Sequence, residues 1–73
     1  MTRILVVEDE RDLALGLRAN LEVEGYDVAV ANTGEDGLRE ARATPAPDLV
    51  ILDLMLPDID GYEVLSRLRR SGL

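Results

Sequence analysis

The sequence contains no cysteine, which excludes disulfide bonds and thiolate metal sites. It also lacks any apolar run approaching the roughly 20 residues that cross a bilayer. Its N-terminus has none of the basic segment, long apolar core and small-residue cleavage site that mark a signal peptide. We therefore expect a cytoplasmic protein that does not act at a membrane.

Lysine is absent as well, so all 8 basic residues are arginine. They are outnumbered by 15 acidic residues, and the net charge is −7 at pH 7. Because binding to nucleic-acid phosphates needs basic patches, we expect no direct nucleic-acid binding by this segment. The 73 residues permit one small domain at most, and an apolar fraction of 47% is typical of a folded chain.

Two short apolar stretches end in acidic residues. Leu49–Leu52 precede Asp53, and Arg3–Val7 precede Glu8 and Asp9. Four apolar residues in a row before Asp53 are typical of a central parallel strand that is buried on both faces. An acid at the carboxyl end of such a strand lies where open α/β sheets place their ligands. If the two strands are neighbours, three carboxylates meet in one crevice.

Such a group of carboxylates favours a bound cation. Two like charges about 5 Å apart repel by roughly 3 kcal/mol at an effective dielectric constant of about 20. A ligand set made of oxygen atoms alone suits Mg²⁺, which takes one or a few carboxylates and keeps several waters. The sequence therefore predicts a Mg²⁺ site at Glu8, Asp9 and Asp53. A simpler interpretation, that Asp53 only ends a strand and caps a loop, stays open at this point.

Apolar spacing predicts the elements between these strands. Residues 12–24 are expected to form an amphipathic helix that ends at Gly25, with a leucine stripe as its core face: Leu13, Leu17 and Leu21. The next stretch, residues 26–31, is typical of an edge strand.

Two further helices are predicted from their capping signals. Thr33 followed by Asp36, and Asp60 followed by Glu63, have the spacing of a helix start. The second of these helices has Gly72 placed to end it and one apolar face, which comprises Val64, Leu65 and Leu68. Strands that alternate with helices in this way predict an α/β fold with a parallel sheet and right-handed crossovers.

The chain resembles the N-terminal part of a response-regulator receiver domain of two-component signalling. The resemblance extends over residues 4–73 and rests on three motifs: the apolar strand with Glu8-Asp9, the strand ending in Asp53, and the loop Met55-x-Pro57-x-x-x-Gly61. It implies that Asp53 is the phosphoacceptor and that Glu8 and Asp9 hold Mg²⁺. The backbone carbonyl of Met55 is implied as a further metal ligand.

The resemblance also implies a flavodoxin-like, doubly wound parallel sheet with the strand order 2-1-3-4-5. Residues 1–73 would supply its strands 1–3, in the order 2-1-3, and helices 1–3. We therefore expect a truncated receiver domain, without strands 4 and 5 and their helices. The implied phosphoryl donor is a sensor histidine kinase. Residues 53–69 are most similar to the transcription-regulating branch that carries a winged-helix output domain.

In the resembled family, a Ser or Thr ending strand 4 and a Lys ending strand 5 contact the phosphoryl group. Neither position exists in this chain, and the chain has no lysine. We therefore expect a phosphoacceptor with impaired phosphoryl transfer, which is not a turnover enzyme.

Two alternative interpretations account for parts of the same sequence. A haloacid-dehalogenase-type phosphatase also places a nucleophilic Asp after a buried strand, but it needs a second Asp where this chain has Met55. A non-catalytic assembly or decoy module would instead bind another receiver, or a second copy, through the open edge of strand 3.

Overall fold

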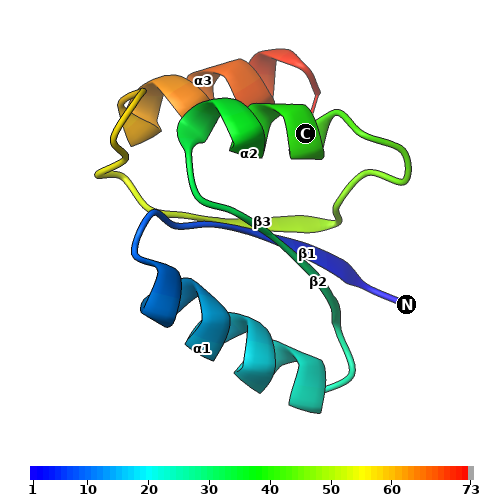
Figure 1. Ribbon diagram of the computed structural model, residues 1–73. Helices are drawn as coiled ribbons and strands as arrows, with labels where there is room; N and C mark the ends of the chain where they lie inside the picture. The colour runs from blue at the N-terminus through cyan, green and yellow to red at the C-terminus, as the bar shows by residue number, and fades with distance from the viewer. Residues whose placement is uncertain (73) are drawn as a thin grey trace.

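The computed structural model describes residues 1–72, which form three parallel strands and three helices (Figure 1). Leu73, at the end of the predicted domain range, lies outside the described residues. Strands and helices alternate along the chain as predicted: β1 (Arg3–Val7), α1 (Arg11–Val23), β2 (Asp27–Ala31), α2 (Gly34–Ala41), β3 (Leu49–Leu52) and α3 (Gly61–Arg70). None of the helices described is both long enough and apolar enough to cross a membrane.

The sheet has the order β2-β1-β3, as the resemblance implied. Val7, the last residue of β1, is in register with Ala31 on one side and Leu52 on the other. The backbone ladder continues one residue further on both sides. The Glu8 N–H donates to the Ala31 carbonyl (2.9 Å), and the Asp53 N–H donates to the Val7 carbonyl (2.9 Å). The residues that follow β1 and β3 therefore lie together at the carboxyl ends of the strands, which we call the carboxyl edge of the sheet.

The three helices cover the two faces of the sheet unequally (Figure 1). Helices α2 and α3 lie side by side on one face, where Leu5 and Val7 of β1 pack with Leu38 and Val64. Helix α1 lies alone on the other face. The hydrophobic core between α1 and the sheet includes Ile4, Val6 and Val28. Because β1 is the central strand, its apolar residues are buried alternately toward both faces.

The apolar run Leu49–Leu52 predicted a central strand buried on both faces, and that prediction is wrong, whereas the predicted order 2-1-3 with strand 3 at an open edge is confirmed. Strand β3 pairs only with β1 within the described chain, so it is an edge strand of the sheet. Leu49 is 53% exposed, and the other three residues are only partly buried. A run of four apolar residues shows that a strand favours burial, but it does not show that a neighbouring strand is present.

The predicted leucine stripe of α1 is wrong at one position. Leu17 and Leu21 pack against the core of the α1 face, but Leu13 is 51% exposed, whereas Ala14 is buried. The helix is therefore rotated so that Ala14 faces the sheet. Leu13 lies on a flank that no other described helix covers. Gly25 adopts a φ of 93° just after the helix, which confirms the predicted left-handed ending.

The predicted start of α2 is confirmed, and that of α3 is confirmed in part. Thr33 caps α2 and accepts a hydrogen bond from the Asp36 N–H (3.1 Å). Asp60 caps α3, but it accepts from the Tyr62 N–H (2.8 Å). Glu63 does not complete the predicted capping box, because its carboxylate accepts hydrogen bonds from two arginines on later turns of the helix, Arg67 and Arg70.

The apolar face and the C-terminal end of α3 follow the sequence prediction closely. Val64 and Leu68 are buried on the predicted apolar face, whereas Leu65 is 36% exposed at its border. Gly72 has a φ of 91°, as expected of a residue that ends the helix.

Candidate functional site

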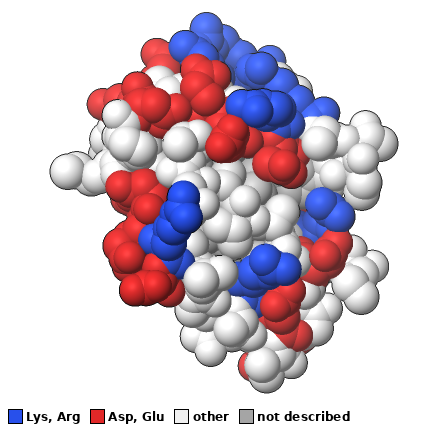
Figure 2. Space-filling view, in the orientation of Figure 1, with Lys and Arg blue, Asp and Glu red and all other residues white. Residues whose placement is uncertain are grey.

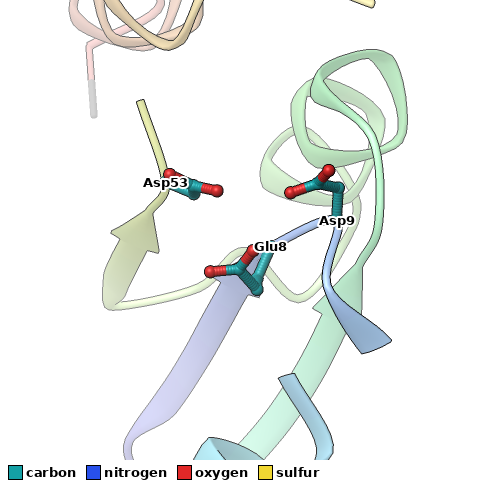
Figure 3. A group of neighbouring side chains, drawn as sticks. All are labelled: Glu8, Asp9 and Asp53. Atoms are coloured by element: carbon teal, nitrogen blue, oxygen red, sulfur yellow. The ribbon is translucent and has the colours of Figure 1, made fainter. Parts of the chain in front are cut away.

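Three acidic side chains converge at the carboxyl edge of the sheet. Glu8 and Asp9 follow β1, and Asp53 follows β3. One carboxylate oxygen from each lies within 4.8 Å of the others, and the three groups face a common space (Figure 3). Two of the side chains, Glu8 and Asp53, are half-buried, and Asp9 is exposed. The expectation that the ends of the two strands bring these residues together is confirmed.

Backbone contacts orient the members of this cluster. The Glu10 N–H donates to Glu8 Oε2 (3.0 Å), and the Met55 N–H donates to Asp53 Oδ1 (3.1 Å). The backbone carbonyl of Glu8 accepts a hydrogen bond from Asn32 Nδ2 (2.9 Å), which comes from the connection between β2 and α2. The Glu8 and Asp53 carboxylates are thus each held by the backbone of the segment that follows them.

The negative charges of the cluster act on one another. The hydrogen bond from the Glu10 N–H lowers the pKa of Glu8. Partial burial, the hydrogen bond and charge of Asp53, and contact with Asp9 outweigh that bond, so the pKa of Glu8 is raised overall. Acidic side chains also crowd the same end of the molecule more widely (Figure 2). The cluster is a local excess of negative charge that a cation would relieve.

The loop after Asp53 is closed by a short contact between its two ends. The Gly61 N–H donates to the Leu54 carbonyl (3.1 Å). A Cβ atom on Gly61 would lie 2.8 Å from the Asp53 carbonyl oxygen, closer than real Cβ atoms come, so only glycine fits. This requirement explains the glycine of the Met55-x-Pro57-x-x-x-Gly61 motif in steric terms. The Met55 side chain is 81% exposed, whereas its backbone lies beside Asp53.

Sequence reasoning missed the role of Asp58 in this loop. Its two carboxylate oxygens accept hydrogen bonds from the N–H groups of Gly34 (2.8 Å) and Glu35 (2.9 Å), the first residues of α2. These contacts, with the Glu35 bond first, lower the pKa of Asp58. Asp58 therefore caps a helix that begins 24 residues before it. No local spacing signal in the sequence could have indicated this pairing.

The donor set fits Mg²⁺. The three side chains supply only carboxylate oxygens, which this hard cation prefers. Glu8 and Asp53 are partly exposed to solvent and Asp9 is exposed, which suits an ion that retains several waters. Among residues 1–72, this is the one group of three potential metal-ligating side chains found so close together.

Comparison with known proteins gives a consistent result. A family model described as "Response regulator receiver domain" matches residues 4–73. The alkaline phosphatase synthesis transcriptional regulatory protein PhoP of Bacillus subtilis is 49% identical over 71 residues, which are 97% of this chain and 29% of that protein. The transcriptional regulatory protein KdpE of Mycobacterium tuberculosis is 52% identical over 69 residues, or 94% and 30%. The chain thus spans less than a third of these relatives, whose names agree with the expected transcription-regulating branch.

Solved structures show the same similarity. The response regulator TrrA of Thermotoga maritima, in complex with Mg²⁺-BeF, superposes with a TM-score of 0.93 at 40% identity, covering 99% of this chain and 62% of that one. In the complex of the histidine kinase ThkA with TrrA, the matching chain has a TM-score of 0.87 at 41% identity, covering 96% and 60%. These matches go against the haloacid-dehalogenase interpretation. The chain belongs to the response regulator receiver domain family.

Proposed function

We propose that this chain is a phosphoacceptor module that takes a phosphoryl group onto Asp53 from a phosphohistidine of a sensor histidine kinase. An oxygen of the Asp53 carboxylate attacks phosphorus in line. The new O–P bond forms as the P–N bond to histidine breaks, and the histidine nitrogen leaves with the electron pair and takes up a proton. The product is an aspartyl phosphate, and the module does not turn over as an enzyme.

Glu8, Asp9 and Asp53 would hold Mg²⁺ in this reaction, together with the backbone carbonyl of Met55. When bound, Mg²⁺ supplies positive charge that offsets the negative charge of the phosphoryl oxygens. The single observation that carries the proposal is the convergence of the three carboxylates within 4.8 Å at the carboxyl edge of the sheet. The Met55 N–H adds to it, because its bond to Asp53 Oδ1 fixes the direction of the nucleophile.

Several properties of the whole protein belong to the same proposal. We propose a cytoplasmic location, a sensor histidine kinase as partner, and no direct contact of this segment with nucleic acid or membrane. Residues 1–73 would form the N-terminal part of a receiver domain, with strands 1–3 and helices 1–3, since the chain covers 62% of the TrrA chain. Mass measurement after treatment with acetyl phosphate and Mg²⁺, with Asp53→Asn as the control, tests the central step.

A second candidate function rests on the edge of β3. Leu49 is 53% exposed there, and among residues 1–72 no strand pairs with the backbone groups of β3 on the side away from β1. An assembly or decoy module would use this edge to bind another receiver or a second copy of itself. The two functions separate experimentally, because Asp53→Asn abolishes phosphorylation and leaves binding through β3 intact.

A further inference from the structure

The loop after Asp53 is fixed to a part of the chain that precedes it. Of the residues between Asp53 and α3, Asp58 makes the longest-range polar contact, to the N–H groups of Gly34 and Glu35. Both bonds are short, and each carboxylate oxygen accepts one of them. Amide groups at a helix start have no partner within their own helix, so a carboxylate placed there is held firmly.

The close approach of the loop to the start of α2 requires a residue without a side chain at position 34. A Cβ atom on Gly34 would lie 3.0 Å from Ile59 Cγ1 and 3.2 Å from Asp58 Oδ1. Glycine at position 34 therefore lets residues 58 and 59 of the loop approach the helix. Ile59 also packs against the core between the sheet and α2. The hydrogen bonds of Asp58 and the apolar contact of Ile59 thus hold these two neighbouring loop residues against α2 and the core.

The same chain segment also contacts the backbone of the acidic cluster after β1. Asn32, two residues before Gly34, donates from Nδ2 to the backbone carbonyl of Glu8 (2.9 Å). Residues 32–35 therefore bond to the segment that carries Glu8 and also to the loop that carries Met55. Asn32, Gly34 and Glu35 form a brace between the two strand ends from which the carboxylates project.

Met55 links the brace to Asp53. It lies between two fixed points of the loop, the Asp53 N–H bonded to Val7 and the carboxylate of Asp58 bonded to α2. Its own N–H donates to Asp53 Oδ1 (3.1 Å). We propose that Asp58 is a positioning residue, which holds the loop against the start of α2 and thereby sets the Met55 backbone and the direction of the Asp53 carboxylate. Its chemical consequence rests on the proposed function of Asp53 and its Mg²⁺ site.

A matched pair of variants tests this inference in the full chain. Asp58→Asn and Asp60→Asn each remove one negative charge from the same loop. Asn caps a helix about as well as Asp, so Asp60→Asn keeps the cap on α3. Asn at position 58 can accept only one of its two hydrogen bonds, and it turns an NH₂ group toward the other amide. Thr33→Ala is a third variant, which weakens the start of α2 without touching the loop.

The first measurement is amide hydrogen exchange at Met55 in metal-free protein. Faster exchange in Asp58→Asn, with no change in Asp60→Asn or Thr33→Ala, supports the inference. Equal exchange in all three variants overturns it. The second measurement is the Kd for Mg²⁺ by calorimetry, which we expect to rise roughly tenfold in Asp58→Asn alone, as for other groups that orient metal ligands.

The two measurements separate this inference from the proposed function. If the wild-type chain binds no Mg²⁺ but Met55 exchange responds to Asp58→Asn, the positioning role stands and the proposed Mg²⁺ site fails. If Mg²⁺ binds and both measurements give the same values for Asp58→Asn and Asp60→Asn, the positioning role fails and the proposed site stands.

Discussion

Gly37 of α2 lies so close to Val7, the last residue of β1, that a Cβ atom at position 37 would come within 2.9 Å of Val7 Cγ2. The helix can reach this part of the sheet only because residue 37 has no side chain. Val7 directly precedes Glu8, so the same close contact fixes the end of β1 from which the acidic cluster begins. The glycine, which weakens an isolated helix, here permits the packing of the site.

Gly37→Ala should therefore destabilise the fold, although alanine is the better helix former. Overpacking against Val7 costs about 1–3 kcal/mol, which over most of that range is more than the gain in helix propensity of about 1 kcal/mol. Gly16→Ala is the matched control, because Gly16 lies in α1 with nothing within 4 Å of a Cβ atom, and it should stabilise the chain. Urea unfolding of both variants checks this. A stabilised Gly37→Ala variant would contradict the packing argument.

The stability of the chain should fall on acidification partly through Asp58. The bonds from the Glu35 and Gly34 N–H groups lower its pKa in the folded state. Its contribution is then complete above the unfolded pKa of about 3.9 and is lost as the pH falls through the lower, folded pKa. The unfolding free energy of Asp58→Asn should thus depend less on pH below about pH 4 than that of the wild type.

Thr33→Ala provides the control for this pH dependence. It removes an uncharged cap from the same helix, so it should lower stability by a similar amount at every pH. Urea unfolding at several pH values gives the slopes. An equal slope for wild type and Asp58→Asn would show that the Asp58 contact contributes nothing to acid sensitivity.

Mg²⁺ should stabilise the folded chain through the acidic cluster. A ligand that binds only the native state adds RT ln(1 + [L]/Kd), about 1.4 kcal/mol at a concentration about ten times the Kd. Thermal melts with and without millimolar Mg²⁺ measure the shift. Asp9→Ala should lose it, whereas Asp12→Asn, which removes a charge from the first turn of α1 outside the cluster, should keep it. A shift of equal size in Asp9→Ala would count against the site.

The chain should self-associate through the edge of β3. Leu49–Leu52 present an apolar edge with no Pro and no charge, which is typical of strands that pair with other chains. Leu49→Lys should reduce association in sedimentation experiments at micromolar concentration. Leu15→Lys is the control, because Leu15 is similarly exposed (57%, against 53%) but lies on α1. A wild-type chain that sediments as a folded monomer would refute this prediction.

The parts of the fold that depend on local pattern could be predicted from the sequence. Apolar runs located the strands, and the meeting of parallel carboxyl ends brought Glu8 and Asp53 together, because that geometry follows from strand direction alone. Thr33 and Gly25 marked helix ends for equally local reasons. The strands and helix ends are determined by residues within a few positions of one another, and the meeting of Glu8 with Asp53 needs in addition only that the two strands are parallel neighbours.

Features that depend on distant neighbours could not be predicted. Spacing placed Leu13 on an apolar helix face, but it could not show that no second helix of the described chain covers that flank. Asp58 bonds to Gly34 and Glu35, which lie 24 and 23 positions earlier in the chain, and this spacing follows no periodicity. Glu63 had the spacing of a capping residue, yet two arginines compete for its carboxylate. The outcomes at Leu13 and Asp58 depend on the tertiary structure around them, whereas the outcome at Glu63 depends on competition from Arg67 and Arg70 of its own helix.

Intact-mass analysis after treatment with acetyl phosphate and Mg²⁺ tests the central claim, that Asp53 is the phosphoacceptor, most directly. We expect one added phosphoryl group, about 80 Da, on part of the wild-type protein, since the chain has no lysine to contact that group. Labelling should need Mg²⁺ and should be absent in Asp53→Asn, while Asp48→Asn, outside the cluster, should label like the wild type. Undiminished labelling of Asp53→Asn would contradict the assignment of Asp53 as the phosphoacceptor.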